Sequence, residues 1–425
     1  MEIGIKPRLR AMMFLQFFLN GTTLPIFSLY LKDILHFSGT QAGLVIGMSA
    51  VSSFVSPVLA SLVADRLLRA ERLYGLCHTV GGLLMLILFF QHSFLPVLFV
   101  YLVYMLIYGP TNALVNVITL HHSPDARRRF SGIRLWGTVG WVAVAWLFGF
   151  FWLRGGTAAH VSQRLPDALI LSSIVSFILG AYSLLIPRSP AISTRSDRMG
   201  SAASRQSIPP AVTVQSPRGR LFPRESLRVL AEPQVALFLV ISFIVYAMDT
   251  YYYFGGALFL TALRVPAGTI MPLMSIGQMV EIATMALLGI ALSRFSFKAV
   301  LVAGILMELL RFGLLLVGRP FLVVVVGLAA HGLCFGLFFG TAPIFLDSRS
   351  DASTRSGVQQ FFTIVTGGLG ALVGNLSAGR AFDAVSASGG GVDTFRLYWA
   401  IPAAAALITA GVMTLFFREP VMRRA

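Results

Sequence analysis

Apolar residues occur along this chain in long, almost uninterrupted runs, whereas soluble domains show short alternations of apolar and polar positions. Each run is close to the about 20 residues that a transmembrane helix needs. Twelve runs can be placed, over residues 11–31, 43–64, 73–92, 95–119, 133–153, 167–187, 234–255, 270–292, 299–318, 321–346, 357–379 and 397–417. Because a bilayer requires every backbone polar group to be satisfied internally, and these lengths suit helices, we predict an all-α polytopic membrane protein with twelve transmembrane helices.

Composition and charge agree with this interpretation. The chain has 425 residues, of which 56% are hydrophobic and 12% are charged, so it carries far less charge than a soluble protein of this size. Of its 33 Lys and Arg residues, 24 fall in the pieces on the side of the termini and 7 in the loops on the opposite side. Positive charge is retained in the cytoplasm, so we predict that both termini are cytoplasmic. The net charge of +16 is then a topology signal, and we expect no nucleic-acid partner.

The longest polar stretch divides the chain into two parts. Residues 188–233 are rich in Ser, Pro and Arg and have almost no apolar periodicity, which predicts a flexible cytoplasmic linker. It would join an N-terminal six-helix bundle, residues 1–187, to a C-terminal six-helix bundle, residues 234–425. Short motifs repeat between the two: residues 131–134 resemble 356–359, and residues 61–66 resemble 289–294. A duplicated bundle is typical of a transporter whose halves rock about a central site.

Five residues are charged inside the predicted spans: Arg134, Asp249, Glu281, Glu308 and Arg311. Charge within a bilayer is costly, so each is a candidate functional residue. Glu308 and Arg311 are three residues apart on one predicted helix, which favours a local structural pair.

Glu281 lies in the middle of its span, one helical turn after Gln278, so both side chains can line one cavity. A carboxylate opposite an intramembrane arginine such as Arg134 is typical of proton-coupled transport, because burial favours its protonated form while the arginine favours its charged form. The alternative is a static ion pair between Arg134 and Glu281 across the two halves.

Other polar positions are ambiguous. Asp249 is followed by Thr250 and Tyr253 on one helix face, which indicates either a pocket or an interfacial aromatic belt. His331 and Phe335, four residues apart, place an imidazole and a ring on one face of the tenth span. Metal-ligand spacings, a nucleophile elbow and a phosphate loop are all absent from the sequence, so we expect neither an enzyme nor a cofactor or metal.

Several motifs resemble known transporters. Ala64-Asp65-Arg66 loosely resembles the signature between the second and third helices of the major facilitator superfamily. More specific motifs are similar to the nucleoside:proton symporter family of that superfamily. They are Leu15-Gln16-Phe17, Cys77-His78-Thr79-Val80-Gly81, Tyr108 with Pro110-Thr111, Ile133-Arg134-Leu135-Trp136-Gly137-Thr138-Val139-Gly140, Met274-Ser275-Ile276-Gly277-Gln278 with Glu281, and Leu310-Arg311-Phe312.

The resemblance implies the major facilitator fold with a central nucleoside site, in which Phe335 stacks on the base and Arg134 binds the solute. The predicted substrate-binding residues are Arg134, Thr138, Trp141, Thr250, Tyr253, Gln278, Glu281, His331 and Phe335. Proton coupling is assigned to Glu281 and Asp249, and a cytoplasmic gate to Asp65 and Arg66.

The chain departs from the family at three places in this predicted site. Gly336 stands where the family usually has an acidic residue, and His331 stands where tyrosine is common. Thr250 and Tyr253 replace a face that usually carries amides. Asp249 offers a substitute carboxylate.

We therefore expect a multi-pass, monomeric transporter of the inner (plasma) membrane that imports a nucleoside by proton symport with alternating access. Its partners would be the nucleoside, protons and membrane lipid. One alternative is a proton symporter for another small solute, such as a sugar or an aromatic acid, on the same fold. A second is a transport-dead membrane receptor that signals through the 188–233 segment. Import and export share the same fold physics, so the sequence leaves the direction open.

Overall fold

The computed structural model describes residues 5–55, 69–122, 126–154, 163–187, 224–351, 353–387 and 391–419. All regular structure in these ranges is helical, which confirms the predicted fold class. Within them, eleven helices are long and apolar enough to cross a membrane, and a shorter apolar helix, Gly39–Val55, lies in the second predicted span. The predicted gating residues Asp65 and Arg66 lie outside the described ranges.

The first half of the bundle carries six of the predicted spans, several of them interrupted by short segments with tighter or wider turns, labelled η. Its helices are α1 (Ile5–Thr23), α2 (Phe27–Leu29), η1 (Tyr30–Ile34), α3 (Gly39–Gly47), η2 (Met48–Ala50), α5 (Ala70–Phe89), α6 (Phe94–Tyr108), α7 (Thr111–His121), α8 (Ala126–Leu147), η3 (Phe148–Trp152), α10 (Asp167–Tyr182) and η4 (Ser183–Leu185). The predicted fourth span is divided between α6 and α7 at Pro110, because proline lacks the backbone N–H that a continuous helix needs.

The second half is built in the same way. Its helices are α11 (Arg224–Leu230), α12 (Pro233–Ala262), α13 (Ala267–Met274), α14 (Ile276–Arg294), α15 (Phe297–Val317), α16 (Phe321–Cys334), η6 (Phe335–Phe339), α17 (Gly340–Ser348), α18 (Arg355–Thr363), η7 (Ile364–Gly370), α19 (Ala371–Ser386) and α20 (Val392–Phe416). Helix α11 lies within the segment predicted to be a flexible linker. Its buried Ser226 hydroxyl donates to the Thr354 carbonyl oxygen at 3.2 Å, so this end of the segment packs on the bundle.

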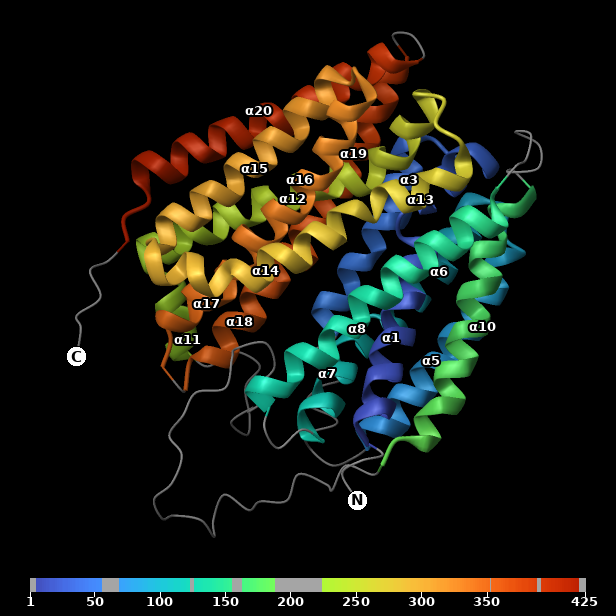
Figure 1. Ribbon diagram of the computed structural model, residues 1–425, viewed down its shortest axis with the longest axis horizontal. Coiled ribbons are helices and arrows are strands. Elements are labelled where there is room, and N and C mark those ends of the chain that lie inside the picture. Colours follow the sequence, from blue (N-terminus) through green and yellow to red (C-terminus); the bar gives the residue numbers. More distant parts are fainter. Residues whose placement is uncertain are drawn as a thin grey trace.

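Helices pair in the same pattern in both halves. In the first half α1 packs on α8 and α5 on α10, and in the second half α12 packs on α19 and α15 on α20. Figure 1 shows the two halves, blue to green and yellow to red, lying side by side. Bulky apolar side chains such as Phe151 (76% exposed) and Leu184 (82% exposed) point outward, as a lipid-facing surface requires.

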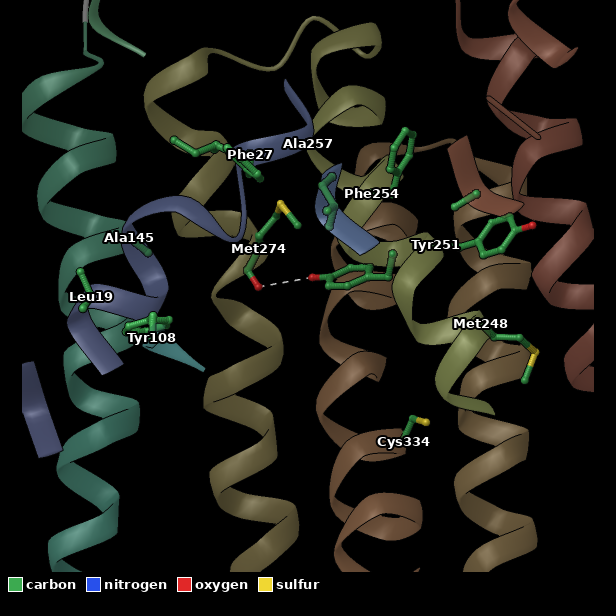
Figure 2. Packing of buried hydrophobic residues seen from close by; sticks show 14 of the residues in the cluster. Leu19, Phe27, Tyr108, Ala145, Met248, Tyr251, Phe254, Ala257, Met274 and Cys334 are labelled. Atoms are coloured by element: carbon green, nitrogen blue, oxygen red, sulfur yellow. Dashed lines mark hydrogen bonds between the residues drawn. The ribbon is translucent and has the colours of Figure 1, made fainter. Parts of the chain in front are cut away.

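Buried apolar side chains from both halves form one continuous core. Figure 2 shows part of it, with Leu19 and Ala145 from the first half and Met248, Tyr251 and Phe254 from α12. Across the two halves, α8 packs on α14 and α13, and α2 packs on α12.

Candidate functional site

A cavity of about 280 Å³ lies between the two halves, close to the lower end of the about 300–1,000 Å³ typical of small-molecule sites. Its walls combine aromatic rings with a few charged and polar side chains, as sites for small polar molecules do. It is lined by Phe17, Leu24, Ile46, Ser49, Arg134, Thr138 and Trp141 from the first half and by Tyr246, Asp249, Thr250, Tyr253, Gln278, Glu281, Phe335, Ala371 and Asn375 from the second half.

The structure brings together eight of the nine predicted substrate-binding residues. On α8, Arg134, Thr138 and Trp141 follow one another at intervals of four and three residues, so they share the helix face that borders the cavity. Gln278 and Glu281 share a face of α14 for the same reason. The remaining three of the eight are Thr250, Tyr253 and Phe335, and the ninth predicted residue, His331, does not line the cavity.

Some lining residues were missed by sequence reasoning. Phe17 stands in a motif that carries the family resemblance, and Asn375 is an amide inside an apolar span, which is itself a polar signal. Tyr246 precedes Asp249 by three residues, so the helical spacing that places Asp249 also places Tyr246. Ser49 lies within η2 and carried no signal, because serine is common in membrane helices.

Arg134 and Glu281 face the cavity from opposite halves. The guanidinium of Arg134 lies 4.0 Å from the ring centroid of Phe17, a cation–π contact that supports the charge away from water. Arg134 and Glu281 interact electrostatically, yet among the described residues neither one takes part in an ion pair within 4 Å or a side-chain hydrogen bond. The static ion pair considered from the sequence is therefore not formed in this structure, and both groups remain accessible to a solute.

A buried charged cluster extends from Asp249, in the second-half wall of the cavity, into the protein behind it. We call Asp249, Glu308, Arg311 and His331 the Arg311 cluster. The guanidinium Nη1 of Arg311 donates to Asp249 Oδ1 at 2.9 Å, lies 2.5 Å from His331 Nδ1, and the same side chain pairs with Glu308. The local Glu308–Arg311 pair predicted from the sequence is thus formed, but Asp249 of α12 and His331 of α16 extend it across three helices.

Tyr253 connects this cluster to the cavity. Its hydroxyl lies 3.2 Å from His331 Nε2, and Gln278 Nε2 donates to the same hydroxyl oxygen at 3.4 Å. Tyr252 stacks on the imidazole with 4.8 Å between ring centroids and donates to the Met274 carbonyl oxygen, drawn as the dashed line in Figure 2. His331 therefore supports the cavity wall from behind.

The first half holds a buried polar network without charge. Gln16 Oε1 accepts hydrogen bonds from Tyr74 Oη at 2.8 Å and lies 2.9 Å from His78 Nε2. Its Nε2 donates to Thr111 Oγ1 at 3.0 Å, and Tyr108 Oη also lies within reach at 3.3 Å. Gln16, His78, Tyr108 and Thr111 belong to the motifs that carry the family resemblance, whereas Tyr74 does not. Because they bond one another and lie outside the cavity wall, their contribution is to fix α1 against α5 and α7.

At one end of the bundle a carboxylate joins the halves. Asp383 at the end of α19 accepts hydrogen bonds from the backbone N–H groups of Gly39 at 2.5 Å and Thr40 at 2.7 Å, and from the Thr40 hydroxyl at 2.8 Å. A Cβ added at Gly379 would lie 2.1 Å from the Gly39 carbonyl oxygen, so the two backbones touch and only glycine fits. The first turn of α3 is thereby capped by the other half of the protein.

A second contact joins the halves at η3 and α13. A Cβ added at Gly149 would lie 2.6 Å from the Gly268 carbonyl oxygen, which again requires glycine. Nearby, Trp146 Nε1 donates to Ser275 Oγ at 3.1 Å. Together with the Asp383 contact, these interactions hold α3 to α19 and η3 to α13, so the bundle is closed at this end.

Replacing Asp383 by asparagine is expected to weaken this closure. The amide keeps one acceptor oxygen and loses the charge, which costs about 1–2 kcal/mol and shifts the equilibrium between closed and open states by about 5- to 30-fold. Ser49→Cys, placed in the cavity wall, should then react faster with a membrane-impermeant maleimide added on the side opposite the termini. Asp393→Asn, which makes the same change at an exposed carboxylate, is the matched control. Equal reaction rates for Ser49→Cys alone, with Asp383→Asn and with Asp393→Asn would contradict the prediction.

Comparison with known proteins gives consistent matches over the whole chain. A family model described as "Nucleoside H+ symporter" matches residues 3–422. The xanthosine permease of Escherichia coli (strain K12) is 27% identical over 428 residues, which cover 98% of this chain and 96% of the relative. The nucleoside permease NupG of the same strain is 24% identical over 424 residues, covering 98% and 96%.

Solved structures share the fold. The crystal structure of the nucleoside transporter NupG matches with a TM-score of 0.82 at 22% identity, covering 98% of this chain and 100% of that chain. The crystal structure of a D-xylose-proton symporter matches with a TM-score of 0.70 at 12% identity, covering 97% and 98%. At these identities the two structures establish the fold alone, a helical architecture of two bundles.

Proposed function

Because the chain belongs to the nucleoside H⁺ symporter family, whose members are multi-pass major facilitator transporters and not enzymes, we propose that it imports nucleosides together with protons through the cavity between its halves. The relatives named as xanthosine and nucleoside permeases support nucleosides as the solute class. We place the protein in the inner membrane on the same grounds. One chain encloses the cavity, which supports a monomer as the transporting unit.

The observation that carries this proposal is that Arg134 and Glu281, neither of which has an ion-pair partner among the described residues, face one cavity from opposite halves. In the proposed cycle Glu281 takes up a proton, and a nucleoside then bridges the two walls, with Arg134 and Gln278 as hydrogen-bonding groups. The aromatic ring of Phe335 offers a stacking surface for the base. A solute that contacts both walls binds most tightly when the halves close on it, so binding drives the alternation between the two open states.

Two segments would move against each other in this cycle, residues 1–187 and residues 234–425. The contacts between Asp383 and α3 would break as the opposite face opens. Asp65 and Arg66 remain our prediction for the cytoplasmic gate.

A second candidate solute is an aromatic acid. The observation in its favour is the guanidinium of Arg134, which makes no ion pair among the described residues and matches a carboxylate in geometry. The two solute classes are distinguished by competition. If the solute is an aromatic acid, an unlabelled aromatic acid reduces uptake of a labelled one, whereas an uncharged nucleoside does not.

The proposal is tested by uptake of labelled uridine into cells that lack their own nucleoside transporters, with and without a protonophore. We expect accumulation that the protonophore abolishes. In Arg134→Ala the loss of charge-assisted hydrogen bonds should weaken apparent affinity about 10- to 100-fold, whereas Arg396→Ala, which removes an exposed arginine on α20, should behave as wild type. Uptake that the protonophore does not reduce, or an apparent affinity that is unchanged in Arg134→Ala, would contradict the proposal.

A further inference from the structure

The direction of hydrogen bonding in the Arg311 cluster is fixed by its arginine. A guanidinium only donates hydrogen bonds and stays charged. Nη1 of Arg311 carries two hydrogens, and its two partners are Asp249 Oδ1 at 2.9 Å and His331 Nδ1 at 2.5 Å. The imidazole nitrogen that accepts from Arg311 carries no proton, and Asp249 Oδ1 lies farther from it, at 3.3 Å. His331 is therefore neutral, with its proton on Nε2.

The same direction continues to the cavity wall. The protonated Nε2 of His331 lies 3.2 Å from Tyr253 Oη and donates to it, and Gln278 Nε2 donates to the same oxygen at 3.4 Å. A phenol oxygen that accepts both of these bonds has its own hydrogen left to donate. Because Tyr253 lines the cavity, that hydrogen is offered to the solute.

Gln278 contributes a hydrogen-bond acceptor, whereas Tyr253 contributes a donor. Its side chain is 7% exposed, and its amide nitrogen is committed to Tyr253. Its carbonyl oxygen Oε1 is buried and has no hydrogen-bond partner among the described residues. A buried acceptor left unpaired is costly, so this oxygen points to a ligand that donates to it.

The two groups lie beside a stacking surface. Phe335 and Tyr253 flank the same imidazole, with ring centroids 5.9 Å and 5.5 Å from that of His331. A flat base that stacks on Phe335 can therefore direct its edge toward the Tyr253 hydroxyl and Gln278. That edge meets one donor and one acceptor.

We propose that this cavity prefers nucleosides whose base presents a lactam edge, a ring N–H beside a carbonyl oxygen, over those that present an amino group beside an unprotonated ring nitrogen. Uridine and inosine have the lactam edge, and cytidine and adenosine have the reverse. With the ribose held on one side of the cavity, the carbonyl oxygen accepts from Tyr253 and the ring N–H donates to Gln278 Oε1. An amino base in that same orientation places its amino group against the Tyr253 donor and its ring nitrogen against the Gln278 acceptor. The inference rests on the proposed function and names the substrate class of that same cavity. His331 and Arg311 act in it as positioning residues.

The test uses the purified full chain in liposomes with an imposed proton gradient, because liposomes contain no enzymes that interconvert nucleosides. Uptake of labelled uridine is inhibited in turn by unlabelled uridine, inosine, cytidine and adenosine. We expect uridine and inosine to inhibit at concentrations at least about tenfold lower than cytidine and adenosine, since each mismatched edge leaves a buried polar group unpaired.

Variants separate a positioning role from a structural one. Tyr253→Phe removes the donor. The ratio of the inhibitory concentrations of cytidine and adenosine to those of uridine and inosine should therefore fall toward one. His331→Phe keeps the hydroxyl but releases it to rotate, so the ratio should fall as well. His331→Gln can accept from Arg311 and donate to Tyr253, and it should restore much of the ratio. Tyr182→Phe removes a tyrosine hydroxyl that lies outside the cavity wall and should leave the ratio unchanged.

The outcomes distinguish this inference from the proposed function. If the wild-type protein accumulates none of the four nucleosides, the proposed function fails and the preference fails with it. If it accumulates uridine and all four nucleosides inhibit equally, the proposed function stands and the preference is overturned. A wild-type ratio in Tyr253→Phe would also overturn it. This last variant removes one oxygen at the cavity wall, so it tests the preference even if His331→Phe does not fold.

Discussion

Glu281→Gln is expected to abolish accumulation of nucleoside against its gradient while leaving exchange of nucleoside across the membrane intact. Glu281 lines the cavity and makes no ion pair within the described residues, so its carboxylate is accessible to a proton. Glutamine has nearly the same shape as the protonated acid but neither binds nor releases a proton. The loaded carrier can then still alternate, while the step that couples it to the proton gradient is lost.

The size of this effect follows from the driving force. With one proton per nucleoside, a gradient of one pH unit supports about tenfold accumulation, because one pH unit corresponds to about 1.4 kcal/mol. In liposomes the wild-type protein should therefore approach about a tenfold ratio of internal to external uridine, and Glu281→Gln should stay near one. Exchange of internal for external labelled uridine should persist in both.

A matched control is Glu225→Gln, which makes the same change at an exposed carboxylate of α11. It should accumulate uridine as the wild type does. If Glu281→Gln accumulated uridine to the wild-type ratio, proton coupling would have to be assigned elsewhere, and Asp249 would be the next residue to test because it also lines the cavity.

Arg311→Met is expected to cause the largest loss of stability. Arg311 is fully buried and neutralises Asp249 and Glu308, which are 6% and 0% exposed. Removing it leaves these two buried carboxylates without the guanidinium that pairs with both of them. Breaking a buried ion pair in this way costs about 3–5 kcal/mol. The lower stability should be seen when the protein is heated in detergent, as a lower midpoint temperature for the loss of monodisperse protein.

A combined variant tests the cause of this loss. Adding Asp249→Asn and Glu308→Gln to Arg311→Met removes the uncompensated charges and should recover much of the midpoint, because an uncharged buried cluster avoids the desolvation penalty. Arg349→Met serves as the control, since Arg349 pairs with Glu232 at 2.8 Å with both side chains partly exposed, and such a pair contributes at most about 1 kcal/mol. A midpoint for Arg311→Met as high as that of the control would contradict a role for the cluster in stability.

Much of the cavity wall could be predicted from the sequence because it depends on positions within single helices. Arg134, Thr138 and Trp141 follow the helical repeat, and so do Gln278 and Glu281, so each set had to share a face. Charge inside an apolar span indicated which helix faces line the cavity, since a charged side chain in a bilayer is costly and is usually directed toward a polar interior.

The contacts between helices could not be predicted in the same way. The spacing of Glu308 and Arg311 indicated their pair, but the bonds to Asp249 and His331 depend on how α12, α15 and α16 pack. Likewise, His331 shares a helix face with Phe335, yet the wide turn η6 begins at Phe335, which places the ring in the cavity wall and leaves the imidazole behind Tyr253.

The Asp383 contact was missed for a related reason. Asp383 lies close to the end of a predicted span, where an acidic residue ordinarily indicates a solvated boundary. Its partners are backbone N–H groups of Gly39 and Thr40, more than 300 residues away, and a backbone donor leaves no trace in the sequence. Only the packing of α3 on α19 reveals it.

The most direct test of the central claim is whether proton movement accompanies nucleoside transport. Uridine is uncharged, so its symport with a proton carries one positive charge across the membrane. On a supported membrane of liposomes that contain the purified chain, addition of uridine should produce a transient inward current in the wild type and none in Glu281→Gln. Transport of labelled uridine by the wild type without any current would contradict the account.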